Sequence, residues 1–464
     1  MPATITIPWN ATLEGRLESF VQLTEVIRLS EALTGPEGGA YPNEANPFTD
    51  DWQEAWGPNH GAPLETKKRY DPHGLLKYWN CDGFQDSDAS QSTAGGPTMA
   101  EAGVLPASTG TPPSDVSKHT LPIAGLQVDI YGLSELPVTA TSVSCLWLHH
   151  PRLQKKEGMA DTAHKVLSTY HHQQQRQNRE DGAAALKNRG LIAVAFDQRN
   201  HGTRLVDPLG NESWNKGNRT HAQDMFATVS GMVSDTVHLM HVLEGYLFGA
   251  GDGPGALVCD GATGKRRIDQ HLVLGVSLGG HSAWELLFAE PRVTAGVMVI
   301  GCPDYMGLLK DRARKSKLET YSGDKGASFL GSKDFPEALI SACQKYDPKG
   351  ILFGAGDIPP APITTAEQER LRPILDSKIR GKRFQVLSGS ADKLVPYSVG
   401  VPFLDFFRDA VATWYRDGNV YVEDKVYPGV GHQFDQEMVK DAIRFILDTV
   451  SQADESSKVA SAKI

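Results

Sequence analysis

Short apolar runs alternate with amphipathic stretches along the chain from about residue 119 to residue 450. Continuous apolar runs of this length are typical of strands buried on both faces, whereas apolar residues three and four apart predict one buried face of a helix. The strands are predicted at 143–148, 191–196, 272–276, 295–300, 383–387 and 420–427. Such alternation predicts an α/β fold, a mostly parallel sheet with helices on both faces.

Other parts of the chain break this alternation and predict its domain organisation. The segment 85–118 is rich in Ser, Thr, Gly and Pro and predicts a flexible linker after an N-terminal fragment, 1–84. The α/β domain is expected at 119–450, followed by a polar C-terminal tail at 451–464. Within the domain, 303–381 is a long polar and helical excursion before the strand at 383. We expect this insertion to form a lid-like cover over a pocket.

Charge and composition narrow the partners and the compartment. The net charge of -10 disfavours nucleic acid and anionic membranes as partners. The five cysteines are widely spaced without a C-x-x-C pair, and are expected to be reduced packing residues. Without a recognisable signal peptide or a long apolar span, a cytoplasmic location is expected. The last three residues, Ala462, Lys463 and Ile464, loosely resemble a peroxisomal address, which is the alternative.

The strongest chemical signal is a serine in a strand-to-helix turn. The apolar strand ending at Val276 leads into the G-x-S-x-G motif of residues 275–279 and then into a helix. Side chains at 275 and 279 would obstruct so tight a turn, and glycine removes them. The sequence therefore predicts Ser277 as a nucleophile that the turn lifts above the sheet edge.

A serine hydroxyl needs a base and a carboxylate that orients the base. Asp392 follows the strand at 383–387, and His432 follows the strand at 420–427, so both are expected at the carboxyl edge of the sheet. In the fold that carries this serine motif, the three catalytic residues follow one another along the chain in the order Ser, Asp, His. Asp304, after the strand at 295–300, is an alternative acid. The alternative interpretation is that His432 is a solvated turn residue and that Asp392 forms a turn by bonding its own backbone.

An acyl-transfer site also needs two donors for the oxyanion. The first is predicted to be the Leu278 backbone amide at the start of the helix. The second should come from the loop after 143–148, where Pro151 has no amide hydrogen, so the Arg152 amide is predicted, with His150 as the next choice. The run FDQRNHGTR, 196–204, is expected to be structural and to hold its loop by hydrogen bonds.

Residues 119–450 resemble the α/β-hydrolase superfamily. The segments FDQRNHGTR, GVSLGGH, GSADKLVP and GVGH look like those of a group of predicted fungal hydrolases. The resemblance implies an α/β-hydrolase fold with Ser277, Asp392 and His432 as the triad. It does not identify a substrate.

Residues 38–84 are similar to the C-terminal end of berberine-bridge-type FAD-linked oxidoreductases. Tyr41, Asn43 and Glu44 match that family's Y-x-N-E turn, and 70–75 match its Y-D-P-x-G-L segment. The flavin-binding domain expected before such a tail is missing, so no FAD is expected to be held. The fragment is interpreted as the product of two neighbouring genes read as one, or as a fusion that has lost its original activity.

These observations predict a serine hydrolase acting on an ester, thioester or lactone of a small organic molecule through an acyl-serine intermediate. No cofactor or metal is expected. A role in fungal secondary-metabolite biosynthesis is inferred by association with the oxidoreductase-like fragment. The alternatives are an acyltransferase with the same triad, an FAD-linked oxidoreductase fragment and a non-catalytic binding module. The sequence does not predict the oligomeric state.

Overall fold

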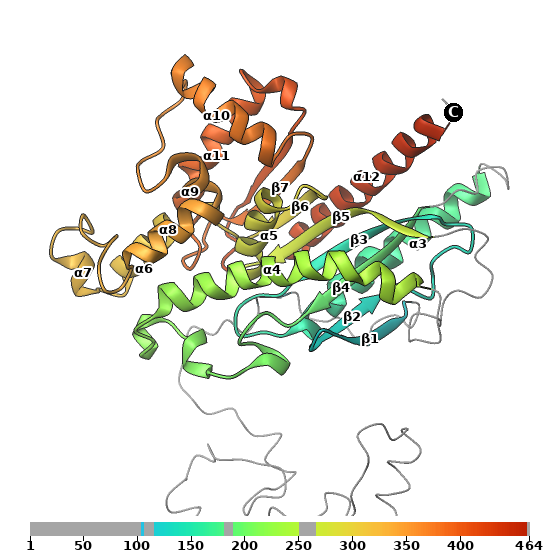
Figure 1. The fold of residues 1–464 in the computed structure, drawn as a ribbon, viewed down its shortest axis with the longest axis horizontal. Helices are drawn as coiled ribbons and strands as arrows, with labels where there is room; N and C mark the ends of the chain where they lie inside the picture. Colours follow the sequence, from blue (N-terminus) through green and yellow to red (C-terminus); the bar gives the residue numbers. More distant parts are fainter. Residues whose placement is uncertain (1–103, 106–115, 181–188, 250–265, 462–464) are drawn as a thin grey trace, which may run out of the picture. The chain divides into compact units, whose positions relative to one another are not determined.

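The computed structural model describes residues 104–105, 116–180, 189–249 and 266–461 (Figure 1). The chain divides into two units, residues 1–98 and 99–464, and all described residues belong to the second. The oxidoreductase-like fragment, most of the predicted linker and the last three residues lie outside the described part. No described helix is long and apolar enough to cross a membrane.

In the described part of the chain, eight strands form one sheet in the order β1-β2-β4-β3-β5-β6-β7-β8. The strands from β4 to β8 in that order are parallel, and β1 and β2 are antiparallel. The six strands predicted from the sequence are confirmed. The bounds are β1 Lys118–Ile123, β2 Leu126–Tyr131, β3 Ser142–His149, β4 Gly190–Phe196, β5 Arg267–Val276, β6 Val293–Val299, β7 Arg383–Gly389 and β8 Tyr421–Tyr427.

The β1–β2 hairpin is an element that the sequence analysis did not predict. Its two-residue turn, Ala124 and Gly125, has positive φ at both positions, 49° and 81°. Hairpin turns of this kind fit the twist of the strands but usually carry Asn-Gly or Asp-Gly. Ala-Gly therefore gives no strong sequence signal.

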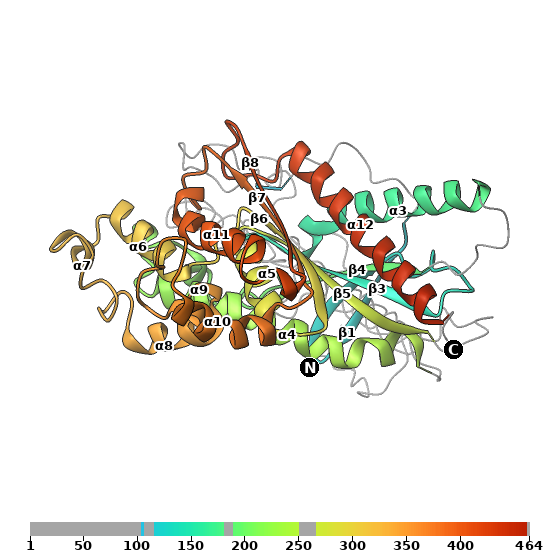
Figure 2. The ribbon, with the colours of Figure 1, turned by 90° about the horizontal axis from the view of Figure 1, so that it is seen from above.

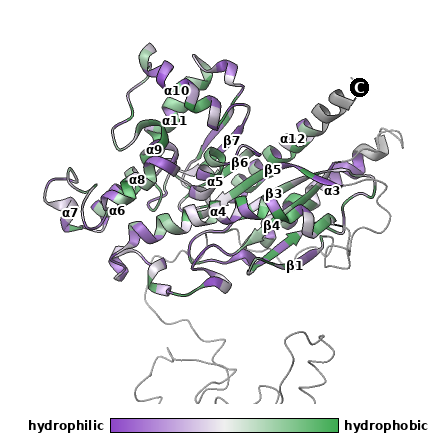
Figure 3. Cartoon of the chain, in the orientation of Figure 1, coloured by the Kyte–Doolittle hydropathy of each residue, from purple (hydrophilic) through white to green (hydrophobic). Residues whose placement is uncertain are grey.

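Helices cover both faces of the sheet because alternate strand residues point to opposite sides. Cys145 and Trp147 of β3 pack in one apolar cluster, and Leu146 and Leu148 pack in another. Figure 2 shows α3 and α12 side by side on one face, and Figure 3 shows the central strands in hydrophobic colours. The helices of the two layers are α3 Ala160–Glu180 and α12 Gln436–Ser461 on one face, with α4 His221–Phe248, α5 Leu278–Ala289, α10 Thr365–Lys378 and α11 Tyr397–Ala412 on the other.

The predicted excursion between β6 and β7 is helical. It contains α6 Tyr305–Lys315, α7 Glu319–Ser322, α8 Glu337–Tyr346, α9 Pro348–Phe353 and α10. A third apolar cluster joins α6 and α8 to the start of α4, to Leu278 and to Val395. The excursion thus packs beside the carboxyl edge of the sheet, where the serine turn lies.

Short 3₁₀ helices complete the described elements. They are η3 Lys156–Met159, η5 Gly202–Arg204, η6 Pro208–Asn211, η7 Trp214–Lys216 and η9 Arg416–Gly418. At the other end of the domain, α12 continues to Ser461, so it includes most of the segment predicted as a polar tail.

Candidate active site

Ser277 lies in a sharp turn between β5 and α5, with φ of 56° and ψ of -110°. Positive φ is strained for a residue with a side chain, and such strain is often found at functional sites. A Cβ at Gly275 would lie 1.9 Å from the Gly279 carbonyl oxygen, and one at Gly279 would lie 2.1 Å from the His149 carbonyl oxygen. The glycines of the motif are therefore required by close backbone contacts, as the sequence predicts.

Three side chains that are distant in sequence form one hydrogen-bonded chain. The Ser277 hydroxyl is 2.8 Å from His432 Nε2, and His432 Nδ1 is 2.7 Å from Asp392 Oδ2. Ser277 is 7% exposed, and the side chains of His432 and Asp392 are 9% and 0% exposed. All three groups are largely shielded from solvent, and the Asp392 side chain is completely so.

The local turn explains how Asp392 is aimed at His432. Its other carboxylate oxygen, Oδ1, accepts hydrogen bonds from the amides of Leu394 and Val395, at 2.8 and 2.9 Å. These two bonds leave Oδ2 for His432. The alternative interpretation of Asp392 as a turn residue predicts such side chain to backbone bonds, and they occur here together with the bond to His432.

The loops that carry the acid and the base lie directly against each other. The Ala391 amide donates to the Val430 carbonyl, at 2.9 Å. A Cβ at Gly389 would lie 2.4 Å from that same carbonyl oxygen. Gly389 is thus a supporting residue that the sequence analysis missed, because only the tertiary structure brings Val430 beside it.

The structure places Asp304, the alternative acid, at the start of α6. Asp304 is the N-cap of α6 and accepts a hydrogen bond from the Gly307 amide at 2.8 Å. Burial raises the pKa of the Asp304 carboxyl. The carboxylate bonded to His432 is that of Asp392, so Asp304 has a structural function at a helix start.

The first predicted oxyanion donor has a suitable position. Leu278 is the first residue of α5, and the first amides of a helix have no partner within the helix. The partial positive charge of a helix N-terminus favours an anion there. The backbone amide of Leu278 follows Ser277 directly. This position agrees with the predicted function of the amide as an oxyanion donor, which stays a prediction.

The second predicted donor, the Arg152 amide, lies in the loop after β3, and its function stays a prediction.

Two histidines stand between β3 and Arg152 in the chain. His149 at the end of β3 is fully buried, and its ring contacts the hydroxyls of Ser282 and Thr236 at 2.8 and 3.1 Å. His149 is therefore structural. The neighbouring His150 ring is also buried, so its side chain is not exposed to a substrate.

The loop 196–204 is structural, as predicted from its sequence. Asp197 accepts hydrogen bonds from the amides of Lys156 and Thr203, both at 2.9 Å. Gly202 has φ of 52°, and a Cβ there would lie 2.3 Å from the Asp197 carboxyl group. The adjacent Gln198 contacts His150, a link between two loops that the sequence analysis did not predict.

Three described cysteines, Cys145, Cys302 and Cys343, are free and buried, which agrees with their predicted packing function. Cys81 and Cys259 lie outside the described residues. In the described ranges, no group of three or more His, Cys, Asp or Glu side chains could hold a metal.

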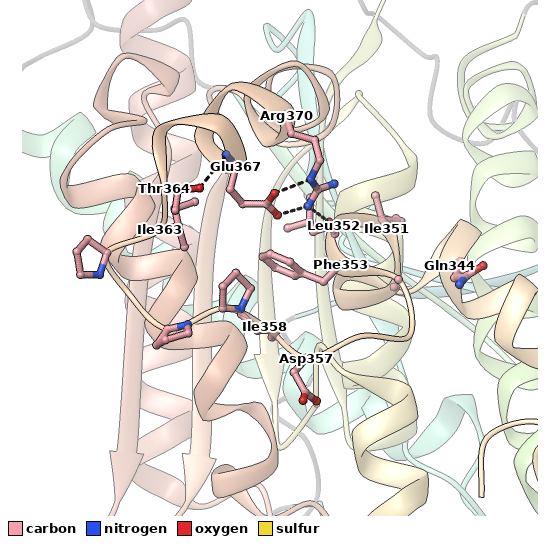
Figure 4. Close-up of a pocket in the computed structure, with 15 residues that line it drawn as sticks. Gln344, Ile351, Leu352, Phe353, Asp357, Ile358, Ile363, Thr364, Glu367 and Arg370 are labelled. Atoms are coloured by element: carbon pink, nitrogen blue, oxygen red, sulfur yellow. Dashed lines mark hydrogen bonds and ion pairs between the residues drawn. The ribbon is translucent and has the colours of Figure 1, made fainter. Parts of the chain in front are cut away.

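A cavity of about 980 Å³ lies in the excursion, among α8, α9, α10 and the segment between the last two (Figure 4). Its apolar side includes Phe353 and Ile358, and its polar side includes Glu367, which is paired with Arg370. No triad residue lines it, so this cavity is separate from the serine turn.

The class of the domain is defined by parallel strands with helices on both faces, a serine turn after β5, an acid after β7 and a histidine after β8. The described residues form an α/β-hydrolase fold, which confirms the resemblance seen in the sequence. No family model matches the chain.

Curated relatives match a small part of the chain. An FAD-linked oxidoreductase, cheF, from Chaetomium globosum is 48% identical over 81 residues, which are 17% of this chain and 13% of that protein. The FAD-linked oxidoreductase OXR2 from Pyricularia oryzae is 41% identical over 85 residues, 18% of this chain and 15% of that protein. These matches confirm a resemblance to FAD-linked oxidoreductases that spans less than a sixth of their length.

Solved structures similar to the chain include the protein TT1662 from Thermus thermophilus, with a TM-score of 0.38, 16% identity, and coverage of 72% of this chain and 98% of that one. A cold-adapted esterase from an Arctic intertidal metagenomic library has a TM-score of 0.35 and 12% identity, over 72% of this chain and 93% of that one. The α/β-hydrolase fold is assigned from the strand order and the serine turn, and not from these similarities.

Proposed function

We propose that the domain is a serine hydrolase that cleaves an ester, thioester or lactone of a small organic molecule. The observation that carries this proposal is the unbroken hydrogen-bonded chain from Ser277 through His432 to Asp392. Each of the three groups stands in the geometry that nucleophilic catalysis needs.

In the first half of the cycle, Ser277 Oγ attacks the acyl carbon while its proton passes to His432 Nε2. The carbonyl electron pair moves to oxygen and forms the tetrahedral oxyanion, which the amides of Leu278 and Arg152 would stabilise. Asp392 stabilises the imidazolium that forms. When the bond to the leaving oxygen or sulfur breaks, His432 returns the proton to it, and the acyl group remains on Ser277.

In the second half, water takes the place of the leaving group. His432 accepts a proton from the water as its oxygen attacks the acyl-serine carbon. Collapse of the second oxyanion breaks the bond to Ser277 Oγ, which receives the proton back from His432. The products are a free acid and the resting serine.

The biological setting is part of the same proposal. The likeness of part of the chain to FAD-linked oxidoreductases supports, by association, a substrate from fungal secondary metabolism. We propose a cytoplasmic location, with a peroxisomal one as the alternative.

The test is hydrolysis of nitrophenyl acetate and nitrophenyl butyrate by the full chain, by Ser277→Ala and by Ser341→Ala. Ser341 is an exposed serine on α8 and serves as the matched control. We expect Ser277→Ala to lose at least about 10³-fold in kcat and Ser341→Ala to match the wild type. Equal turnover by wild type and Ser277→Ala would remove the proposal.

A further inference from the structure

The buried ring of His150 connects two loops at the edge of the sheet. Its Nε2 accepts a hydrogen bond from the Gln198 amide, at 3.0 Å. A neutral imidazole that accepts at Nε2 carries its proton on Nδ1. The Nδ1–H therefore donates to the Pro151 carbonyl oxygen, 2.8 Å away.

This bond sets the orientation of the peptide between Pro151 and Arg152. The Pro151 carbonyl also accepts from the Gln154 amide, at 3.3 Å, so two donors hold it in one direction. In a planar trans peptide the N–H points opposite to the C=O. The Arg152 N–H is thereby turned away from the His150 ring.

The same loop emerges beside the serine turn. His149, the residue before His150, is paired in register with Gly275 of the G-x-S-x-G motif. Its carbonyl oxygen lies so near Gly279 that a Cβ there would be 2.1 Å away. Residues 150–152 thus leave the sheet beside the serine turn.

We propose that His150 is a positioning residue of the oxyanion site, whose ring holds the Pro151–Arg152 peptide so that the Arg152 amide faces the oxyanion. This inference rests on the proposed serine hydrolase function. The ring acts through the backbone and touches neither substrate nor the triad.

The surroundings of His150 keep its ring neutral and keep its hydrogen bonds in place. Burial, together with the neighbouring His201 ring at 5.4 Å, lowers the pKa of His150 to about 4. The ring is neutral above that pH, and its Nε2 keeps the lone pair that Gln198 needs. The Gln198 side chain also donates to the His150 carbonyl, and Asp197 holds the Lys156 amide at the far end of the loop.

The test compares His150→Asn, His150→Gln and His150→Leu. An Asn side chain places its amide near the Nδ1 position and can still donate to Pro151, whereas Gln places it near Nε2, and Leu donates nowhere. We measure kcat and KM for a nitrophenyl ester, and the inhibition constant of a trifluoromethyl ketone, which forms a tetrahedral oxyanion adduct with an active serine.

Loss of one oxyanion donor costs about 10²–10³-fold in kcat, so a misaligned donor in His150→Leu should cost about 10–100-fold, with KM changed less than about 3-fold. The inhibition constant of the ketone should rise by a similar factor. His150→Asn should exceed His150→Gln in kcat by about tenfold, and this comparison stands if the Leu variant does not fold.

The matched control is His271→Leu. His271 is also buried, its pKa is lowered by burial to about 4, and its Nδ1 accepts from Trp147, but it lies within β5. We expect this variant to lose stability and to retain kcat within about 3-fold. If His150 had a purely structural function, His150→Leu would behave like His271→Leu: it would lose stability and retain kcat within about 3-fold.

Equal kcat for the Asn and Gln variants, or a ketone inhibition constant that stays at the wild-type value while kcat falls, would overturn the positioning function. In that case the wild type still hydrolyses the ester through Ser277, and the proposed function stands. A wild type that hydrolyses nothing overturns the proposed function and this inference together.

Discussion

Replacing Asp392 with Asn should inactivate the enzyme while leaving the fold intact. In the wild type, Oδ1 of Asp392 accepts from the Leu394 and Val395 amides and Oδ2 accepts from His432. An asparagine can satisfy both backbone amides only with its carbonyl oxygen. Its NH₂ group then faces His432 Nδ1 and requires that nitrogen to accept. The proton moves to Nε2, which can no longer accept from Ser277.

The size of the expected loss in kcat follows from the free-energy cost of the opposite side-chain rotamer of the asparagine. Turning the asparagine round would aim its NH₂ at one part-buried and one buried amide, those of Leu394 and Val395, and each unsatisfied donor costs about 1–3 kcal/mol. The correct tautomer is then disfavoured by about 2–6 kcal/mol, which corresponds to roughly 30-fold to 10⁴-fold in kcat. The lost charge that stabilises the imidazolium adds to this loss.

The assay is nitrophenyl ester hydrolysis by Asp392→Asn beside Asp304→Asn. Asparagine is as good an N-cap as aspartate, so Asp304→Asn should keep its bond to the Gly307 amide and keep wild-type kcat. A loss of less than about tenfold in Asp392→Asn, or a larger loss in Asp304→Asn, would refute the assignment of the acid.

Two further predictions concern stability. In Gly279→Ala the new Cβ would meet the His149 carbonyl at 2.1 Å, so we expect the free energy of unfolding to fall by about 3 kcal/mol or more, measured by urea denaturation; a loss below about 1 kcal/mol would contradict the packing of the turn. Burial, and then the charge of Asp347, raises the pKa of Glu285 well above its usual value of 4.5. A raised pKa in the folded state stabilises the protein below pH 4.5, and this contribution is lost as pH rises toward the folded-state pKa. Glu285→Gln should therefore gain stability over the wild type as pH increases from 5 to 8, and a difference independent of pH would contradict this.

The sequence was sufficient for the parts of the site that depend on local pattern. The serine turn has strict backbone contacts at Gly275 and Gly279, and only glycine meets them, so the motif carries its own structural evidence. The strands were predicted because their buried residues are continuous along the chain. The order of Ser277, Asp392 and His432 then placed the triad at one edge of the sheet.

Contacts between distant segments were not predictable in this way. Asp304 and Asp392 both follow a strand, and the sequence could not show that one caps α6 while the other faces His432. The link from Gln198 to His150 joins two loops that meet only when β3 and β4 pair. The β1–β2 hairpin escaped prediction because its Ala-Gly turn is unusual.

The central claim is that Ser277 is an activated nucleophile. The most direct measurement is treatment of the full chain with a fluorophosphonate, followed by intact mass and peptide mapping. We expect one adduct, on Ser277, and no adduct in Ser277→Ala. Folded wild-type protein that carries no adduct, or carries it on another residue, would contradict the account.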